Sequence, residues 1–476
     1  MPIIGHALAY KHDPAAFVTV QCETIGPCFR VNLAGKKMVI IGRSSEAMRQ
    51  VALAPESVLS ARQAVLDIGF EETLGVLNVT VGTDMHKRIL KANYAASGLE
   101  KEVPQLYASL GMAITRRLAA TEPAFAVDAS SSALVADLFG LVRFAMLRAA
   151  VERMLGPAVL AAAGDDFLDA FMAYQDAIEE ATAKAAVMPR CLALPLALRP
   201  VRRKRAAISA RLATAINAAV ENARHHSHDG RDTDGGLGPW IHTMVVKEGR
   251  SFSDAAELSC GLLFAAHKNP AIGAAQALLY TLAEVPSALF AAVKAEAAAL
   301  HADPSAATLE RCAGLRSICD ETLRLCAHAI GAVRTVKAPE GFELRVDGGG
   351  SSGDAAEVCS TYHLPAGTTV ALAHIPTHRD VSIWGARAEQ FDATRPEWQK
   401  SVPRPDDYTL TTFSQGLHRC PGERLAVPMM QCAMAQLLNG SCVTTLEPAF
   451  PVPPIDFERA TLAQRASPVT VRIRIQ

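Results

Sequence analysis

The sequence contains no run of about eighteen or more uncharged apolar residues, so we expect no transmembrane helix. Its eleven cysteines form no Cys-x-x-Cys pair and no secretory signal opens the chain, which favours a reducing compartment over a disulfide framework. Charges nearly cancel to a net charge of -1, which gives no sign of a nucleic-acid partner. Aromatic residues make up only 5% of the chain, whereas alanine-rich segments are frequent, so we expect a mainly helical, soluble globular protein.

The most informative stretch is the loop FSQGLHRCPG at residues 413–422. Gly416 permits a tight turn beneath a flat ring, and Gly422 opens a helical pattern whose N-terminal dipole would keep Cys420 ionised. Cysteine thiolate is one of the few axial ligands that proteins give to haem iron, and it favours O–O cleavage. We therefore interpret Cys420 as a haem ligand, with a buried structural cysteine as the alternative.

This loop resembles the haem-binding signature of the cytochrome P450 superfamily, and the fixed positions of that signature are met by Phe413, Gly416, His418, Cys420 and Gly422. The resemblance implies a mainly α fold with a small β-rich region and one catalytic domain over residues 1–476. It also implies haem b, with its iron held by Cys420. The first residues resemble the segment that follows the membrane anchor in microsomal members, so an anchor is either naturally absent or was removed.

A second pattern places Glu321 and Arg324 three residues apart, on one face of a predicted helix. Alone, such a pair is common on helix surfaces and means little. In the P450 resemblance, however, it corresponds to a Glu-x-x-Arg pair that Arg395 completes. Two arginines that share one carboxylate would hold the segment before the cysteine loop in place.

A long helix is predicted from an N-cap at Ser253, and the resemblance places it across the distal face of the haem. Pro270 has no N–H, so the carbonyl of Ala266 loses its helical partner and a kink is expected. Most P450s carry an acid and a threonine here for proton delivery, whereas this chain has Lys268 and Asn269. The resemblance gives Asn269 the role of orienting oxygen beside Ala266, and leaves proton supply to His267 or to ordered water.

The resemblance also suggests that Arg334 and Lys87 bind the haem propionates. For Lys87, a solvated helix face is the alternative. The stretch 187–205 is apolar, broken by proline and then basic, which predicts either peripheral membrane contact or an ordinary interhelical connection. A β-hairpin is predicted over residues 28–42, with its turn near Gly35.

The asparagine and nearby proline resemble the branch that contains cholesterol and bile-acid hydroxylases and prostacyclin synthase, and the helix also resembles that of sterol demethylases. The main hypothesis is a monooxygenase that hydroxylates a lipophilic, sterol- or terpenoid-like substrate, with electrons from an NADPH-dependent reductase or a ferredoxin. The alternative is an isomerase or dehydratase that rearranges a peroxide without a reductase. A non-catalytic haem sensor is the third hypothesis. The expected location is cytoplasmic, or the endoplasmic reticulum membrane if an anchor precedes the chain.

Overall fold

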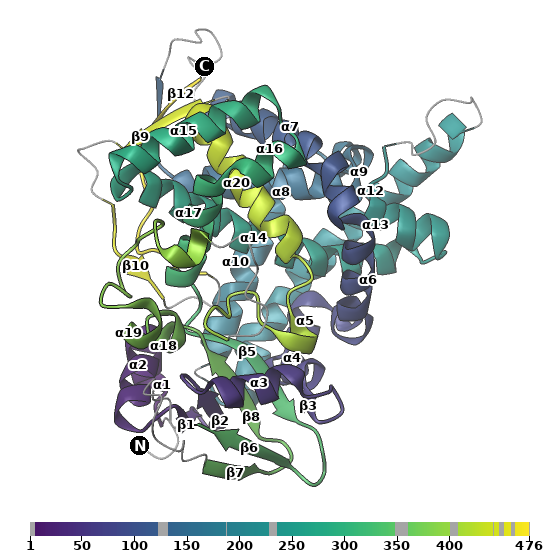
Figure 1. Ribbon diagram of the computed structural model, residues 1–476. Helices are drawn as coiled ribbons and strands as arrows, with labels where there is room; N and C mark the ends of the chain where they lie inside the picture. Colours follow the sequence, from purple (N-terminus) through teal and green to yellow (C-terminus); the bar gives the residue numbers. More distant parts are fainter. Residues whose placement is uncertain are drawn as a thin grey trace.

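The computed structural model describes residues 5–121, 132–186, 188–227, 236–347, 360–399, 408–440, 442–446, 452–457 and 462–475. Most of them are helical, with a β-rich region at the end of the molecule that holds the N-terminus and a smaller sheet at the end that holds the C-terminus (Figure 1). The predicted fold class, mainly α with a small β-rich region, is thereby confirmed. Within these ranges no helix is both long and apolar enough to cross a membrane.

The α-helices occupy most of the chain, from its first described residues to the C-terminal third. They are α1 (Ala7–His12), α2 (Pro14–Thr24), α3 (Ser45–Leu53), α4 (Ala61–Ile68), α5 (Phe70–Leu74), α6 (Thr83–Asn93), α7 (Ala96–Thr121), α8 (Leu138–Ala150), α9 (Pro157–Ala163), α10 (Phe167–Ala186), α11 (Arg190–Ala193), α12 (Arg199–Ser227), α13 (Pro239–Ile241), α14 (Phe252–Ala283), α15 (Ser287–Ala302), α16 (Ala306–Arg311), α17 (Ala313–Leu325), α18 (Ile375–His378), α19 (Val381–Trp384) and α20 (Glu423–Asn439).

Shorter helical turns of other types join several of these helices. The π-helical turns are η1 (Asn78–Gly82), η3 (Val151–Leu155), η4 (Leu194–Leu198) and η5 (His242–Lys247). The 3-10 turns are η6 (Pro396–Gln399) and η7 (Gly416–His418).

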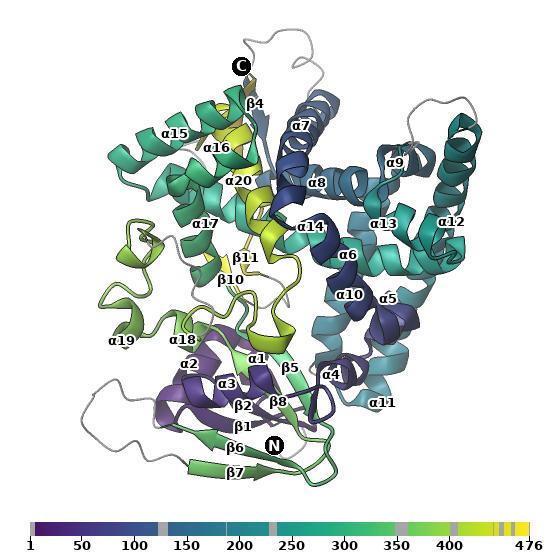
Figure 2. The same cartoon turned by 45° about the vertical axis from the view of Figure 1, so that its right-hand side comes forward.

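The strands form one five-stranded sheet and three smaller ones. They are β1 (Cys28–Leu33), β2 (Lys36–Ile41), β3 (Leu59–Ser60), β4 (Ser132–Val135), β5 (Ile330–Val336), β6 (Phe342–Val346), β7 (Ser360–Leu364), β8 (Thr369–Ala373), β9 (Cys442–Leu446), β10 (Ile455–Asp456), β11 (Gln464–Arg465) and β12 (Val471–Ile475). The largest sheet has the order β1-β2-β8-β5-β3, in which β2 and β8 are parallel and the other pairs antiparallel. It lies near the N-terminus, whereas the β4-β12-β9 sheet lies near the C-terminus (Figure 2).

The predicted β-hairpin is confirmed, because β1 pairs with β2 from Cys28 opposite Ile41 to Leu33 opposite Lys36. Its turn residues Ala34 and Gly35 both have positive φ, at 53° and 89°, as a two-residue hairpin turn requires.

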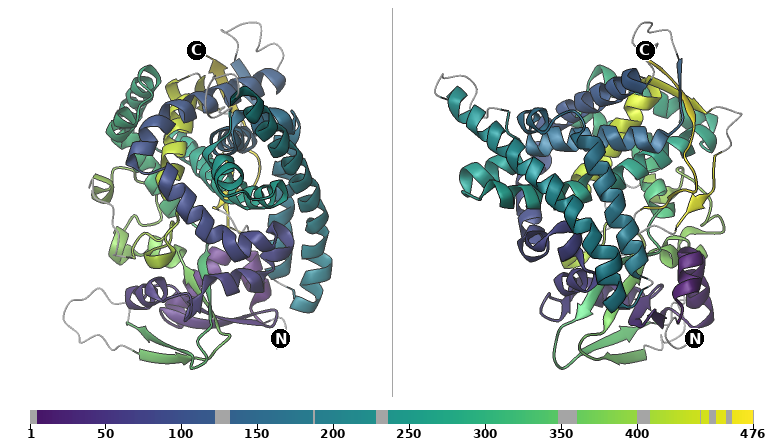
Figure 3. Two further views of the ribbon diagram at one scale, coloured as in Figure 1. Left: turned by 90° about the vertical axis from the view of Figure 1, so that its right-hand side faces the viewer. Right: turned by 180° about the vertical axis from the view of Figure 1, so that it is seen from behind.

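Helix α14 passes through the middle of the helical part, where it packs against α8, α12, α17 and α20 (Figures 1 and 3). Its N-cap is Ser251, whose hydroxyl accepts the backbone N–H of Asp254 at 3.1 Å. The predicted cap at Ser253 is therefore wrong, because the chain becomes helical two residues earlier. The helix continues through Pro270 to Ala283.

Candidate active site

The Cys420 loop is a short turn that runs directly into a helix. The backbone N–H of Cys420 donates to the carbonyl of Phe413 at 2.7 Å and closes the loop, while Gly422 is the N-cap of α20. Partial burial raises the pKa of the Cys420 thiol, and the backbone N–H groups of Gly422 and Glu423 oppose that rise. The thiol side chain remains exposed, so the loop presents sulfur together with donors that favour its anionic form.

Gly416 and Phe413 fix the loop against the rest of the protein. Gly416 has a φ of 63°, and a Cβ there would lie 2.4 Å from the carbonyl oxygen of Ala52 in α3. Only glycine permits this conformation and this approach at little energetic cost. Phe413 is partly buried and packs against the main hydrophobic core.

Three basic side chains gather around this loop. Lys87 of α6 donates through Nζ to the backbone carbonyl of Leu417 at 3.2 Å. Burial lowers the pKa of His418, and the positive charges of Arg334 and Lys87 lower it further, which places the three groups near one another. Burial also lowers the pKa of Arg334, against the opposing charge of Glu56.

Two nitrogens of this basic group are buried without a hydrogen-bond partner in the described part of the chain: Nε of Arg334 and Nε2 of His418. Buried polar atoms almost always have a partner, so Nε of Arg334, and Nε2 of His418 in the tautomer that carries its proton there, fit an anionic ligand. The two propionates of a haem would supply such acceptors beside a thiolate ligand. The donor set of the site therefore fits a haem at Cys420.

The neighbours of Lys87 are directed elsewhere. Arg88 forms an ion pair with Glu248, and His86 is largely buried against Trp240, with ring centroids 5.2 Å apart. Burial lowers the pKa of His86 to about 4. Of the three consecutive basic residues His86, Lys87 and Arg88, Lys87 is the one that contacts the Cys420 loop.

One stripe of α14 is covered less completely than the rest of the helix. Ala265 is exposed, and Ala266 and Asn269 are half-buried, although most of the helix around them is buried. The amide oxygen Oδ1 of Asn269 accepts the backbone N–H of Leu462 at 3.2 Å. Because a backbone N–H can only donate, this contact fixes which end of the amide is oxygen. The NH2 group of Asn269 therefore remains as a donor.

His267 lies on a different side of α14 from this stripe. Its ring packs against Phe171 of α10 with centroids 5.9 Å apart, and Nδ1 is 2.6 Å from the carbonyl oxygen of Leu263. Burial lowers its pKa to about 3, so the imidazole is neutral at physiological pH. The structure does not bring His267 together with Asn269.

Lys268, the next residue, was not among the predicted site residues. It is 2% exposed and forms ion pairs with Asp176 and Glu179 of α10. The signal in the sequence was a lysine inside a long apolar helical run, but its partners lie on a helix far away in the chain.

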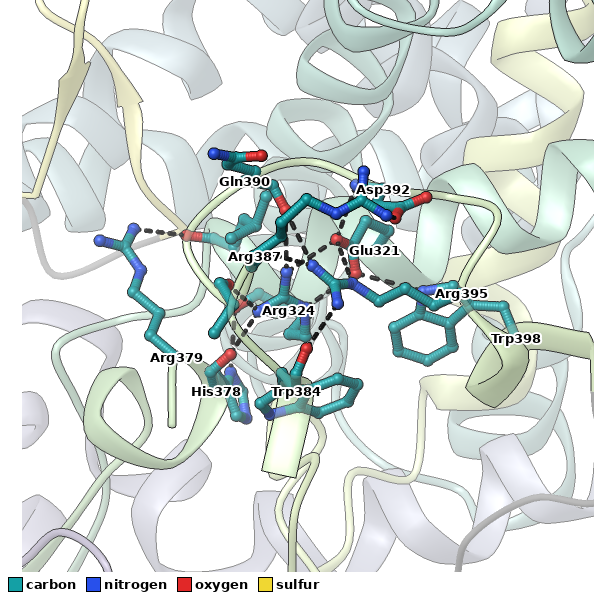
Figure 4. Close-up of polar contacts among 12 residues, drawn as sticks. Glu321, Arg324, His378, Arg379, Trp384, Arg387, Gln390, Asp392, Arg395 and Trp398 are labelled. Carbon is teal, nitrogen blue, oxygen red and sulfur yellow. Dashed lines mark hydrogen bonds and ion pairs between the residues drawn. The ribbon is translucent and has the colours of Figure 1, made fainter. Parts of the chain in front are cut away.

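The predicted pair of Glu321 and Arg324 is buried and has the expected third member (Figure 4). Arg324 donates to both oxygens of Glu321, at 2.7 and 2.8 Å, and Nε of Arg395 donates to Oε1 at 3.1 Å. The backbone N–H of Asp392 and the indole of Trp398 donate to the same carboxylate. Helix α17 is thus tied to the segment that precedes the Cys420 loop.

Comparison with known families agrees with this arrangement. The family model for Cytochrome P450 matches residues 1–456, and the chain belongs to the cytochrome P450 family. Membership implies a haem whose iron is held by a cysteine thiolate, which is the ligand type that the Cys420 loop offers.

Curated relatives match shorter stretches of the chain. Cytochrome P450 734A4 of rice is 32% identical over 26% of this chain and 22% of its own length. Cytochrome P450 83A1 of Arabidopsis thaliana is 38% identical over 16% of this chain and 15% of its own. Cytochrome P450 52-M1 of Starmerella bombicola is 27% identical over 33% of this chain and 27% of its own. The aligned stretches thus span about a quarter or less of these relatives.

Proposed function

We propose that this protein is a haem-thiolate monooxygenase that hydroxylates a lipophilic substrate with dioxygen and electrons from an NADPH-dependent reductase or a ferredoxin. The observation that carries the proposal is the exposed Cys420 thiol beside three basic groups, two of which keep a buried nitrogen unpaired. We further propose that the cofactor is haem b and that residues 1–476 act as one catalytic domain.

In this proposal Cys420 would supply the thiolate that holds the iron, and Arg334, His418 and Lys87 would bind the propionates. Bound there, the haem supplies reductive activation of dioxygen and transfer of one oxygen atom to a C–H bond. The backbone N–H groups at the start of α20 stabilise the thiolate. The ion-pair group around Glu321 holds the segment before the loop and takes no part in the chemistry.

Asn269 is proposed to orient the oxygen-containing ligand through its NH2 group. The hydrogen bond from Leu462 supports this role, because it holds the amide oxygen and leaves the NH2 group of this half-buried residue as a donor. Ala266, which precedes it by less than one turn, carries only a methyl side chain, which leaves space for a ligand beside the helix. His267 is not proposed as a proton donor, because its buried ring is neutral and faces α10.

The substrate class we propose is a sterol- or terpenoid-sized lipid. Its support is the resemblance of the Asn269-Pro270 pattern to the sterol and bile-acid branch of the family, together with the small apolar residues on the same helix. The names of the relatives above state no substrate.

A second candidate function is an isomerase or dehydratase that rearranges a hydroperoxide or endoperoxide. One observation favours it. Lys268 stands where the family resemblance expects an acid, and its side chain pairs with Glu179 of α10. Asn269 stands where a threonine is expected, and its amide is hydrogen-bonded to the backbone of Leu462. Such a site binds a peroxide through a donor without offering it an acidic proton from α14.

Peripheral membrane contact is proposed for the segment around η4. Leu192 and Leu196 are 49% and 64% exposed, and Arg202, Arg203 and Lys204 on the following helix are also exposed. Apolar side chains beside a basic cluster suit a surface with anionic headgroups. Association with the endoplasmic reticulum membrane is the location that this contact would serve.

Mass spectrometry of a panel of sterols and fatty-acid hydroperoxides, incubated with and without reductase and NADPH, distinguishes these functions. A product heavier by one oxygen atom only with reductase is the expected result. Hydroperoxides consumed equally in both conditions, with mass unchanged or reduced by one water, would establish the rearranging enzyme. Haem binding without any product would favour a sensor.

A further inference from the structure

A largely buried polar group lies between helices α8, α10 and α14, on the side of α14 that carries His267 and Lys268. We call it the polar cluster. Its members are Arg143 of α8, Gln175, Asp176 and Glu179 of α10, and His267 and Lys268 of α14.

Lys268 is the centre of the polar cluster. Its Nζ lies 2.5 Å from Oε2 of Glu179 and 3.0 Å from Oδ1 of Asp176. A lysine that is 2% exposed has lost nearly all its hydration, and its charge is tolerated in a helix interior only with such partners. Replacing Lys268 together with both of its carboxylate partners by apolar residues of similar size would often be neutral for stability, so ion pairing alone does not account for the group.

Further hydrogen bonds join the three helices. Arg143 donates to Asp176 at 2.8 Å and to Gln175 at 3.2 Å, and Gln175 donates to the carbonyl of Phe264 at 3.1 Å. Long polar side chains therefore bridge α10 and α14 in an otherwise apolar core.

Three atoms of the polar cluster are nevertheless buried without a partner in the parts of the chain that the structure describes: Nε of Arg143, Oε1 of Glu179 and Nε2 of His267. Electrostatic effects of Arg143, Lys268 and Asp176 act on both His267 and Glu179, so these groups lie close together. Several buried donors and acceptors in one place are the surroundings in which ordered water is found.

The polar cluster connects solvent with the distal turn of α14. At its outer end the side chain of Asp176 is 53% exposed, whereas that of Glu179 is 10% exposed. At its inner end, His267 and Lys268 belong to the turn in which Pro270 gives the Ala266 carbonyl no N–H partner. A carbonyl oxygen that has no N–H partner in its helix can accept a hydrogen bond from water.

The pKa values of the Glu179 and Asp176 carboxyl groups shift in opposite directions. Burial raises the pKa of Glu179 despite the attraction of Lys268. Burial also acts to raise the pKa of Asp176, but the charges of Arg143 and Lys268 bring it below its ordinary value. An inner carboxyl whose pKa is raised and an outer carboxylate whose pKa is lowered form an ordered pair for proton transfer.

We propose that the polar cluster holds ordered water and carries protons from solvent at Asp176, through Glu179, to the Ala266 turn of α14. The inference rests on the proposed monooxygenase function, which consumes protons at that helix. The carboxyl of Glu179 gives its proton to an ordered water, that water passes a proton to the water on the Ala266 carbonyl, and solvent reprotonates Glu179 by way of Asp176. One proton moves inward, and the O–H bond of Glu179 that breaks in the first transfer forms again on reprotonation.

Infrared spectroscopy tests the proton-holding role without any substrate. The wild-type protein should show a carboxylic-acid C=O band that persists above the ordinary pKa of glutamate and shifts in D2O. Glu179→Gln should lose this band, whereas the matched control Glu180→Gln should keep it, because Glu180 is exposed and paired with Lys184. Absence of the band, or a band unchanged in Glu179→Gln, would overturn the proposal.

Asp176→Asn provides a test that does not depend on replacing a buried group. It should slow the exchange of the Glu179 band into D2O after mixing, and leave the band position unchanged. Equal exchange rates in the variant and the wild type would show that protons do not enter through Asp176.

Turnover supplies the functional test, on the lipid that the panel above identifies. Glu179→Gln should lower reductase-supported turnover by roughly 100-fold, the low end for a positioned proton donor, but leave turnover with hydrogen peroxide unchanged. A parallel loss of both would mean a purely structural role. If no lipid is hydroxylated by the wild type, the monooxygenase proposal fails, and the infrared result still decides whether Glu179 holds a proton.

Discussion

Replacing Arg395 with methionine should destabilise the protein strongly while leaving its packing volume nearly unchanged. Arg395 is 7% exposed and donates to Oε1 of Glu321 at 3.1 Å. It also donates to the carbonyls of Trp384 and Gln390, at 2.7 and 3.2 Å. The methionine side chain offers none of these donors, so a buried carboxylate and three carbonyls, with that of Arg387 as the third, lose a partner.

The size of the expected loss in folding free energy depends on the hydrogen bonds that Glu321 keeps. Removing one partner of a buried ion pair costs about 3–5 kcal/mol. Because Arg324 still donates to both oxygens of Glu321, we expect the low end, about 3 kcal/mol. That is a decrease of more than about 100-fold in the folding equilibrium constant.

Urea unfolding of purified protein, followed by circular dichroism, measures this change. Arg387→Met is the matched control, since the Arg387 side chain is 67% exposed and its ion pair is with Asp392, whose side chain is 12% exposed. We expect the control to lose less than about 1 kcal/mol. Similar losses in both variants would refute the conclusion that the buried group around Glu321 holds this region together.

Three further predictions concern the site and its surroundings. Asn269→Asp keeps the acceptor for Leu462 but removes the NH2 donor, so turnover on the identified lipid should fall by about tenfold at unchanged stability; unchanged turnover would exclude a donor role. Lowering the pH from 7 to 5.5 should destabilise the wild type by roughly 1 kcal/mol more than it destabilises His267→Gln. Below the ordinary pKa of histidine the unfolded wild type takes up a proton on His267, whereas in the folded protein the buried imidazole, with its pKa lowered to about 3, stays neutral. Equal urea-unfolding differences between the two pH values in variant and wild type would contradict this. Leu196→Asp should weaken binding to anionic lipid vesicles by about tenfold in a sedimentation assay, and undiminished binding would exclude this segment as the contact.

The sequence predicted those parts of the site that depend on local chain chemistry. The Cys420 loop could be recognised because a glycine with positive φ, a thiol and a helix start must follow one another at fixed spacing. The hairpin at residues 28–42 could be predicted for the same reason, because its two strands and its turn are neighbours in the chain. The partners of Glu321 could be expected only through the family resemblance, since Arg395 lies far along the chain.

Contacts between distant helices could not be predicted. Nothing in the sequence around Lys268 indicates that Glu179 would neutralise it, because their pairing depends on how α10 crosses α14. The same holds for Asn269, whose orientation is set by the backbone of Leu462. The cap at Ser251 was missed because Ser251 and Ser253 are both acceptable N-cap residues, and only the backbone conformation distinguishes them.

The most direct test of the central claim is the absorption spectrum of the reduced protein with carbon monoxide, measured for the wild type and for Cys420→Ser. Cys191→Ser is the control, because Cys191 is also exposed but lies outside the proposed haem site. We predict the red-shifted Soret band of a thiolate-ligated haem in the wild type and the control, and its loss in Cys420→Ser. The same band in Cys420→Ser would contradict the assignment of Cys420 as the iron ligand.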